Sequence, residues 1–216
     1  MKFSVVLLVY IGKPSAIPMT HKCIKLAREK TKIDYELVIV ETCSEYFKDY
    51  CDVHIYEKNR TTPTISCNRG LRAARGEFVV LLTNDVYVED GWLERLWECF
   101  QKHEDCGAST LASTQFNHVV ENKIEEGNWF SVAMLPKDLL DKLGYMDENF
   151  TGVFDDTDLL MRMYKLGYKM YRNFNCVVDH LIRATRGDDT ENFIKNRILY
   201  NKKHEGCELE FFKQTR

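Results

Sequence analysis

Gly-Glu-Phe-Val-Val-Leu-Leu-Thr-Asn-Asp, at residues 76–85, is the stretch that decides the fold. Its apolar run, Phe78 to Leu82, follows a glycine turn and stops abruptly at polar residues, as a buried strand does. The strand ends by presenting Thr83, Asn84 and Asp85. Open α/β sheets bind ligands at the carboxyl ends of their strands, so this stretch predicts a charged ligand site at that edge.

The chain around this stretch alternates between strand and helix signals. The predicted strands of the first half are Phe3–Tyr10, Tyr35–Glu41 and Val53–Tyr56, and the predicted helices are Pro18–Lys30, Ser66–Arg75 and Trp92–Lys102. Gly76 is expected to close the second of these helices as its C-cap. A strand-helix-strand order places strands in parallel, so we predict an α/β fold with a Rossmann-like, mixed and mostly parallel sheet flanked by helices.

The second half is less regular. It predicts strands at Trp129–Leu135, Tyr168–Tyr171 and Cys176–His180, and helices at Pro136–Leu143, Asp158–Leu166 and Asn192–His204. The polar, charged segment Arg183–Thr190 is expected to be a mobile loop.

Bulk properties narrow the class of protein. A chain of 216 residues with 44% hydrophobic content can bury one sizeable core, so we predict a single domain over residues 1–216, either a whole protein or part of a larger multidomain chain. Thirty basic against 33 acidic residues argue against nucleic acid as a partner. Eight scattered cysteines without a C-x-x-C pair indicate thiols of a cytoplasmic protein. No apolar run is long enough for an integral membrane span, so any membrane association would be peripheral.

Three groups of residues could carry chemistry, and each has a plainer interpretation. Asp85 could hold a divalent cation or could cap the turn into the following helix, with equal weight. His180 could add an imidazole ligand favouring manganese, although a lone histidine is more often packed or at the surface. The acids at 155, 156 and 158 open a helix, where they stabilise its dipole. That interpretation does not require three acids directly after an apolar pair.

Polar residues near the other strand ends could contact a nucleotide. Asn59 and Asn68 offer amides near the end of the third strand, and Glu41 is placed to hydrogen-bond a ribose or base, or is simply a solvated acid. The chain has no G-x-G-x-x-G, P-loop or G-x-S-x-G motif, so it lacks the usual signals for hydride transfer, P-loop phosphoryl transfer and nucleophile-elbow hydrolysis.

Taken in order, these segments resemble the inverting family 2 glycosyltransferases of the GT-A fold, over nearly the whole chain to about Arg186. The matching segments are Val38–Ser44 (strand ending in an acid), Asn68–Phe78 (helix-strand lead-in), Leu82–Leu93 (D-x-D region), Phe154–Leu159 with Arg162 (F-E-D-x-D-L-x-x-R) and Val178–His180 (late histidine). Together, these five segments in the right order make a specific signal.

The resemblance implies a role for each candidate residue. Asp85 and His180 would hold a divalent cation, Mn²⁺ or Mg²⁺, Asp156 would be the general base, and Asp155 is the second candidate for that base. The donor-binding residues would be Val9, Tyr10, Glu41, Asn59, Asn68, Thr83, Asn84, Asp85 and Trp129. Residues 1–100 would form the nucleotide-binding half, 101–190 the acceptor and catalytic half, and 191–216 a C-terminal helix and tail.

The implied function is metal-dependent, inverting transfer of a sugar from a nucleotide diphosphate donor, most often a UDP-sugar, to a hydroxyl of a glycan or glycolipid acceptor. Thr83 stands where the family has the first acid of D-x-D. This difference leaves a second function as an alternative, a degenerate transferase domain that binds a nucleotide-sugar or glycan without transferring a sugar. A sugar nucleotidyltransferase is a third alternative, although Ile11–Ser15 is a poor version of its glycine-rich first loop.

Overall fold

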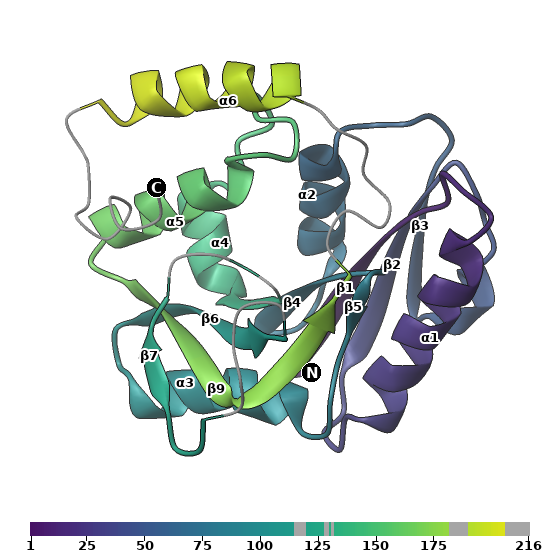
Figure 1. Ribbon diagram of the computed structural model, residues 1–216, viewed down its shortest axis with the longest axis horizontal. Coiled ribbons are helices and arrows are strands. Elements are labelled where there is room, and N and C mark those ends of the chain that lie inside the picture. Colours follow the sequence, from purple (N-terminus) through teal and green to yellow (C-terminus); the bar gives the residue numbers. More distant parts are fainter. Residues whose placement is uncertain (115–119, 128–129, 131, 182–189, 206–216) are drawn as a thin grey trace.

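The computed structural model describes residues 1–114, 120–127, 130, 132–181 and 190–205 (Figure 1). Its strands are β1 (Phe3–Tyr10), β2 (Glu36–Thr42), β3 (Val53–Glu57), β4 (Phe78–Thr83), β5 (Val86–Tyr87), β6 (Cys106–Ser113), β7 (Ile124–Glu126), β8 (Ala133–Pro136) and β9 (Lys169–His180). The helices are α1 (Ala16–Glu29), α2 (Pro63–Ala73), α3 (Trp92–Lys102), α4 (Lys137–Leu143), α5 (Asp155–Lys165) and α6 (Thr190–Lys203), with a 3-10 turn at Lys48–Tyr50.

The strands form a nine-stranded sheet in the order β3-β2-β1-β4-β8-β6-β9-β5, with β7 also paired to β9. The first four strands of that order are all parallel, as the alternation of strand and helix signals predicts. Strand β8 then runs antiparallel between β4 and β6, and β6 pairs in parallel with β9. The predicted α/β fold with a mixed sheet is therefore confirmed.

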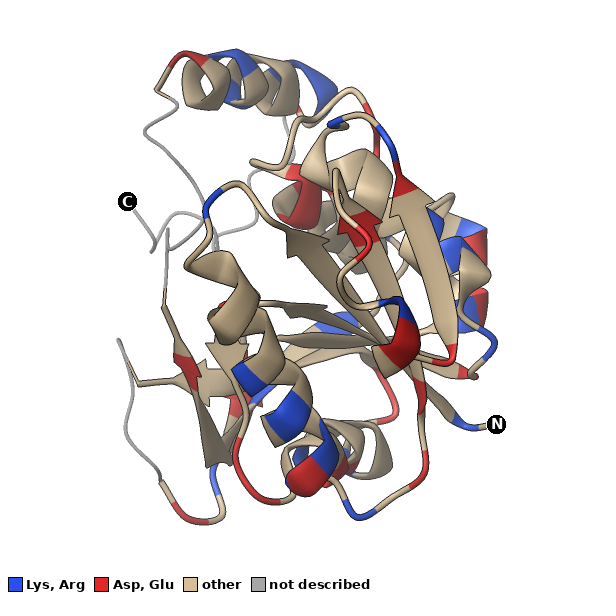
Figure 2. Cartoon of the chain, turned by 90° about the vertical axis from the view of Figure 1, so that its right-hand side faces the viewer, with Lys and Arg blue, Asp and Glu red and all other residues tan. Residues whose placement is uncertain are grey.

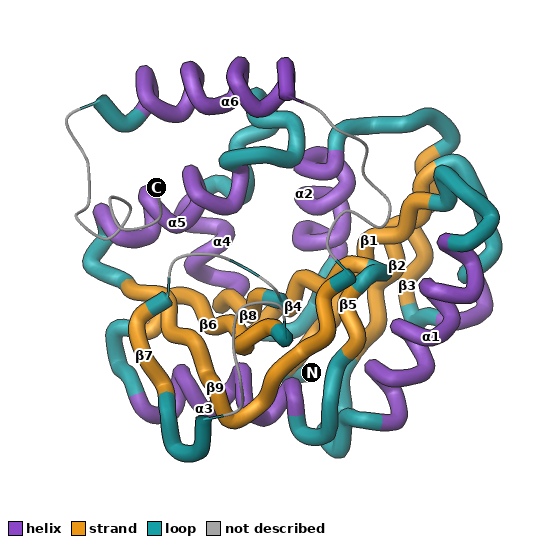
Figure 3. The backbone as a smooth tube through the Cα atoms, viewed as in Figure 1, coloured by secondary structure: helices purple, strands orange, loops and turns teal. Residues whose placement is uncertain are grey.

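Helices cover both faces of the sheet because its strands are apolar on both sides. Along β1, Val5 and Leu7 pack with residues of α1 and α3, whereas Val6, between them, packs with residues of α2, α4 and α5. This is the two-residue alternation of a strand buried on both faces. Figures 1 and 3 show the same layers, with α6 lying as a further layer outside α5.

Parts of the sheet differ from the prediction. Strands β5, β6 and β7 were not expected. Strand β6 is built mainly of small residues, Cys-Gly-Ala-Ser-Thr-Leu-Ala-Ser, that lack the bulky β-branched signal of a strand. The two short strands predicted at Tyr168–Tyr171 and Cys176–His180 are one continuous β9. Its pairing with β6 jumps from Asn173 to Val177, and this polar interruption hid the continuity.

Gly76 has a different role from the predicted C-cap. Helix α2 already ends at Ala73, capped by Ala74 in an extended conformation, and Gly76 instead lies against β1. A Cβ on residue 76 would stand 2.6 Å from the backbone nitrogen of Ser4, and the glycine's own N–H donates to Ser4 Oγ at 2.8 Å. The glycine therefore permits a close approach of two backbone segments.

Replacing Gly76 with alanine is expected to lower the free energy of unfolding by about 2 kcal/mol or more, because the added methyl meets backbone atoms of β1 that cannot rotate away. Urea denaturation measures this loss. Gly144→Ala is the comparison without a clash, since a Cβ there meets no atom within 4 Å, and it reports the cost of alanine at a φ of +76°. A Gly76 variant that unfolds at the same urea concentration as the unaltered chain would contradict the close-approach explanation.

Candidate functional site

The site lies where the parallel strands end. Register pairs Leu8 of β1 with Thr83 of β4, and Tyr10 of β1 with Thr42 of β2, so the carboxyl ends of these three strands share one edge of the sheet. The polar residues that follow each strand therefore converge there, as expected for an α/β fold.

Asp85 and His180 are brought together by a two-residue ladder. Strand β5 pairs antiparallel with the end of β9, with Val86 opposite His180, and the Leu181 N–H donates to the Asp85 carbonyl at 2.9 Å. The His180 Nε2 lies 3.7 Å from Asp85 Oδ1. Thr83 Oγ1 donates to the same carboxylate oxygen at 2.7 Å and so fixes its orientation.

This pair fits the chemistry of a divalent cation. A carboxylate and an imidazole are a ligand combination that suits manganese, and the hydroxyl on Asp85 is the kind of supporting contact that orients a metal ligand. The described residues contain no cluster of three or more histidine, cysteine, aspartate or glutamate side chains that could hold a metal. Among the described residues, Asp85 and His180 are therefore the pair that could contribute to a cation site, together with oxygens of substrate or water.

The second acidic group lies at the start of α5. Thr64, buried in the first turn of α2, donates to Asp155 Oδ2 at 2.8 Å and accepts from the Gly152 N–H, which ties the start of α5 to α2. Asp156 accepts from the Thr157 N–H at 2.7 Å and from its hydroxyl at 3.2 Å.

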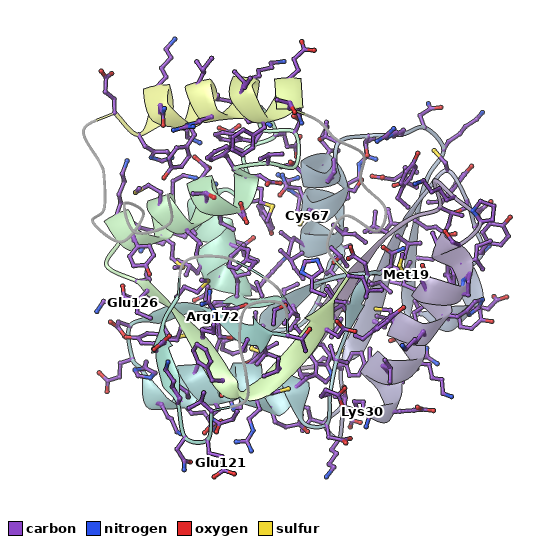
Figure 4. All side chains as sticks on the ribbon, in the orientation of Figure 1. Met19, Lys30, Cys67, Glu121, Glu126 and Arg172 are labelled. Atoms are coloured by element: carbon purple, nitrogen blue, oxygen red, sulfur yellow. The ribbon has the colours of Figure 1, made fainter. Side chains whose placement is uncertain are left out.

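The two neighbouring acids have different surroundings. Burial, and next the adjacent Asp155 carboxylate, raises the pKa of Asp156 to about 6. Burial, followed by the charges of the same two aspartates, raises the pKa of the Cys67 thiol on α2, which is labelled in Figure 4. A carboxylate that is ionised at neutral pH but accepts a proton readily suits a general base, so Asp156 stays the first candidate for that role.

Several predicted donor contacts are already bonded within the protein. The buried Glu41 carboxylate accepts hydrogen bonds from the Ser44 hydroxyl and the Tyr46 and Phe47 N–H groups, and His54 Nε2 lies 2.9 Å from it. Burial opposes its ionisation, but these bonds outweigh burial and keep the pKa of Glu41 below its usual value. Glu41 therefore organises the loop after β2 rather than offering a free acceptor to a ribose or base.

The amides of Asn68 and Asn84 are likewise used. Asn68 is fully buried in α2, where it donates to the Met146 carbonyl and to Glu148 and accepts from the Met146 N–H. Asn84 Nδ2 donates to Thr20 of α1 at 2.8 Å. Asn68 therefore uses both of its amide N–H bonds within the protein, and Asn84 uses its Nδ2. A donor contact through either side chain stays a prediction.

The other donor candidates differ in access. The Val9 side chain is buried in the core, so only its backbone could contact a ligand. The Tyr10 ring is half-buried, and its centroid lies 4.9 Å from the Arg60 guanidinium carbon. Asn59, which directly precedes Arg60, is exposed. Trp129 lies outside the described residues.

A cluster around Glu57 was not predicted. This buried carboxylate, at the end of β3, accepts from the hydroxyls of Thr42, Thr61 and Ser66, and Arg69 pairs with it. Thr42 ends β2, so Glu57 joins the ends of two strands to the start of α2. The sequence signal for Glu57 is an acid directly after a strand. Glu41 carries the same signal and was predicted to contact the nucleotide.

Asp158 forms a second unpredicted cluster that binds α6 to α5. It is fully buried and lies 2.8 Å from Arg162 Nε, 2.7 Å from Lys203 Nζ and 2.8 Å from His204 Nε2. Arg162 also donates to the carbonyls of Leu143 and Tyr145. The Asp-x-x-x-Arg spacing signals the first pair, but nothing in the polar C-terminal helix signals the other two.

Comparison with known proteins identifies the fold and the family of this chain. The family model described as glycosyl transferase family 2 matches residues 4–158. Among solved structures, S. aureus TarS bound to UDP superposes with a TM-score of 0.70 at 16% identity over 99% of this chain and 68% of that chain. The Pyrobaculum calidifontis mannosyltransferase PcManGT, in complex with GDP-Man and Mn²⁺, gives 0.72 at 18% identity over 99% of this chain and 67% of that chain.

GalNAc-T7 with UDP, GalNAc and Mn²⁺ gives a TM-score of 0.71 at 12% identity, over 90% of this chain and 47% of that chain. A structure of TarS is matched over 41% of its length, so this chain spans less than half of that relative. No curated protein sequence matches the chain. The structural likenesses establish the GT-A fold. The family match covers most of the chain, including Asp85 and Asp155–Asp158 but not His180, and the chain belongs to glycosyl transferase family 2.

Proposed function

We propose that this protein transfers a sugar, with inversion, from a nucleotide diphosphate donor to a hydroxyl of a glycan or glycolipid, and that it requires a divalent cation. The observation that carries the proposal is the Asp85–His180 pair, which β5 and β9 hold together at the ligand-binding edge of a family 2 chain. A UDP-sugar is the first donor to test, because two of the similar structures contain UDP.

Asp156 supplies the base in this mechanism. Its carboxylate takes the proton of the acceptor hydroxyl as that oxygen attacks the anomeric carbon, the bond from that carbon to the diphosphate breaks, and the nucleoside diphosphate leaves. A single in-line displacement inverts the anomeric configuration. Asp155, held by Thr64, fixes the first turn of α5 and raises the pKa of its neighbour.

Asp85 and His180 would hold the cation, with Thr83 orienting Asp85. A bound cation supplies charge neutralisation on the leaving diphosphate. Thr83 replaces the first acid of the D-x-D pattern, so the chain offers one carboxylate there, and its hydroxyl supports that carboxylate through the 2.7 Å hydrogen bond.

Nucleotide release from a panel of UDP-, GDP- and dTDP-sugars, with Mn²⁺ or with EDTA, tests this proposal. We expect release from one donor with Mn²⁺, and its loss with EDTA. Asp85→Ala is expected to lower that release by about a hundredfold or more, because the only carboxylate of the pair is gone. His180→Ala should have a smaller effect that added Mn²⁺ partly restores.

Asp90→Ala is the matched control, because Asp90 is an exposed acid five residues on that pairs with Lys30. It should leave release unchanged. Equal release with Mn²⁺ and with EDTA would contradict metal dependence. Calorimetric binding of a nucleotide without release, in the presence of a panel of glycan and glycolipid acceptors, would instead favour the binding-module alternative that Thr83 keeps open.

A further inference from the structure

Helix α6 turns Ile194 and Ile198 outward and packs on the protein through polar side chains and the rings of Phe193 and Tyr200. Its buried residue is Asn196, and His204, just past its end, is also buried, whereas Phe193, Ile194 and Ile198 are 45%, 53% and 64% exposed. Surface helices ordinarily show the opposite arrangement, with an apolar stripe toward the core. An exposed apolar face of this kind marks an interaction surface.

Polar contacts fix which side of α6 faces the protein. Asn192 and Asn196 are hydrogen-bonded to Thr151, and Lys203 and His204 are paired with Asp158. Helix α6 cannot rotate to bury its isoleucines without breaking these bonds. Ile194 and Ile198, one turn apart, therefore stay on its outer, exposed side.

Basic residues surround these two isoleucines. Lys195, Arg197 and Lys202 are exposed on the same helix, where the one acidic residue is Glu191 at its start (Figure 2). This local excess of positive charge contrasts with the net charge of -3 of the whole chain. A second copy of the chain docked through the same face would bring like charges together, so the charge favours an anionic partner.

We propose that the outer face of α6, defined by Ile194, Ile198, Lys195, Arg197 and Lys202, binds an anionic lipid surface. An interfacial helix places apolar side chains at the boundary of headgroups and acyl chains and its basic side chains against lipid phosphates. No helix within the described ranges is long and apolar enough to cross a bilayer.

The position of α6 gives this contact a consequence for the site. Phe193 of α6 packs on Phe154, with ring centroids 5.2 Å apart, and Phe154 directly precedes the Asp155–Asp156 pair. Lipid binding through α6 would therefore bring the candidate base close to the membrane surface. The surface itself is inferred from α6 alone and does not depend on the proposed sugar transfer.

Cosedimentation of the full chain with vesicles tests the proposal. We expect binding to vesicles of phosphatidylcholine mixed with phosphatidylglycerol, little binding to phosphatidylcholine alone, and weaker binding when salt rises from about 0.1 to 0.5 M. Ile194→Ser with Ile198→Ser should lower the affinity about tenfold or more, and a Lys195→Gln, Arg197→Gln, Lys202→Gln variant should lose binding to the anionic vesicles.

Two controls match these variants. Leu166→Ser changes a similarly exposed apolar residue outside α6, and Lys25→Gln changes an exposed lysine of α1; both should bind like the unaltered chain. Equal thermal midpoints would show that the α6 variants remain folded.

Absence of vesicle binding by the unaltered chain would overturn the proposal, and so would full binding by both α6 variants. If light scattering shows a dimer for the unaltered chain and a monomer for the isoleucine variant, the face binds a second copy instead. Binding that appears only after removal of residues 206–216 would assign it to that segment of the chain. Nucleotide release is a separate measurement, so failure of membrane binding leaves the proposed transfer untouched.

Discussion

Asp156→Asn is expected to reduce sugar transfer by about a hundredfold to ten-thousandfold, because the amide keeps the shape of the side chain but cannot take the acceptor proton. The hydrogen bonds from Thr157 can be accepted by the amide oxygen, so the start of α5 should keep its structure. The measurement is the initial rate of transfer with the donor that the nucleotide-release panel identifies.

The pH dependence gives a second readout of the same residue. The base must be ionised, and its pKa is about 6, so kcat/KM of the unaltered chain should fall about tenfold per pH unit below pH 6. The folded-state pKa lies above the ordinary value of 3.8, so stability from this group is gained as pH falls from about 6 toward 4 and is missing at neutral pH. The asparagine variant should therefore unfold at a higher temperature than the unaltered chain at pH 7, by an amount matching about 1 to 2 kcal/mol.

Asp138→Asn is the control, since it changes an exposed acid in the first turn of another helix, α4. It should leave both the rate and the acid limb of the pH profile unchanged. An Asp156→Asn protein with normal transfer would assign the base to another residue, and Asp155 would then be the first to replace.

Asp158→Asn should destabilise the protein by about 3 kcal/mol or more, because it removes the buried carboxylate that three basic side chains face. Lys165 Nζ lies 3.1 Å from His204 Nδ1, so Nδ1 accepts and the Nε2–H donates to Asp158. Burial lowers the pKa of His204, and the Asp158 bond only partly opposes this. A neutral His204 agrees with that arrangement.

Thermal unfolding and hydrogen exchange together measure this effect. In a chain of this length, the loss corresponds to a fall in Tm of about 6–12 °C. Amides of α6 should exchange faster in the variant than in the unaltered chain, and this increase should be larger than the increase for amides of α1. Asp158 holds α6, and not α1, to the protein. Asp147→Asn removes another partner of Lys203 and should cost about 1 kcal/mol or less. Unchanged exchange in α6 would show that its contacts with Thr151 and Phe154 suffice.

The predictable parts of the fold are the elements whose sequence signal lies within one short segment of the chain. The local hydrophobic pattern is enough to predict strands β1 and β4, which are apolar runs, and helix α3, which has a stripe of Leu93 and Leu96. Strand β6 could not be recognised, since small residues become a strand only when β8 and β9 flank them. The jump in register after Asn173 likewise depends on a partner far away in the sequence.

The same distinction applies to the candidate site. Acids at strand and helix ends can be found in the sequence, and the structure does bring Asp85 to His180. The hydrogen-bond partners of a side chain cannot be predicted from its position in the sequence. Glu41 and Asn68 carry the expected groups at the expected ends, but their hydrogen bonds are satisfied by loop and helix partners that only the folded chain supplies.

The ladder between β5 and β9 has a consequence for the order in which the protein is made. Residues 1–87 contain the four parallel strands and Asp85, and this half can form its contacts early during synthesis. Strand β9 is the last strand within the described residues, and His180 is its final residue. The ribosome must therefore release that residue before the two candidate metal ligands can meet, and a nascent chain carries the four parallel strands before this pair can form.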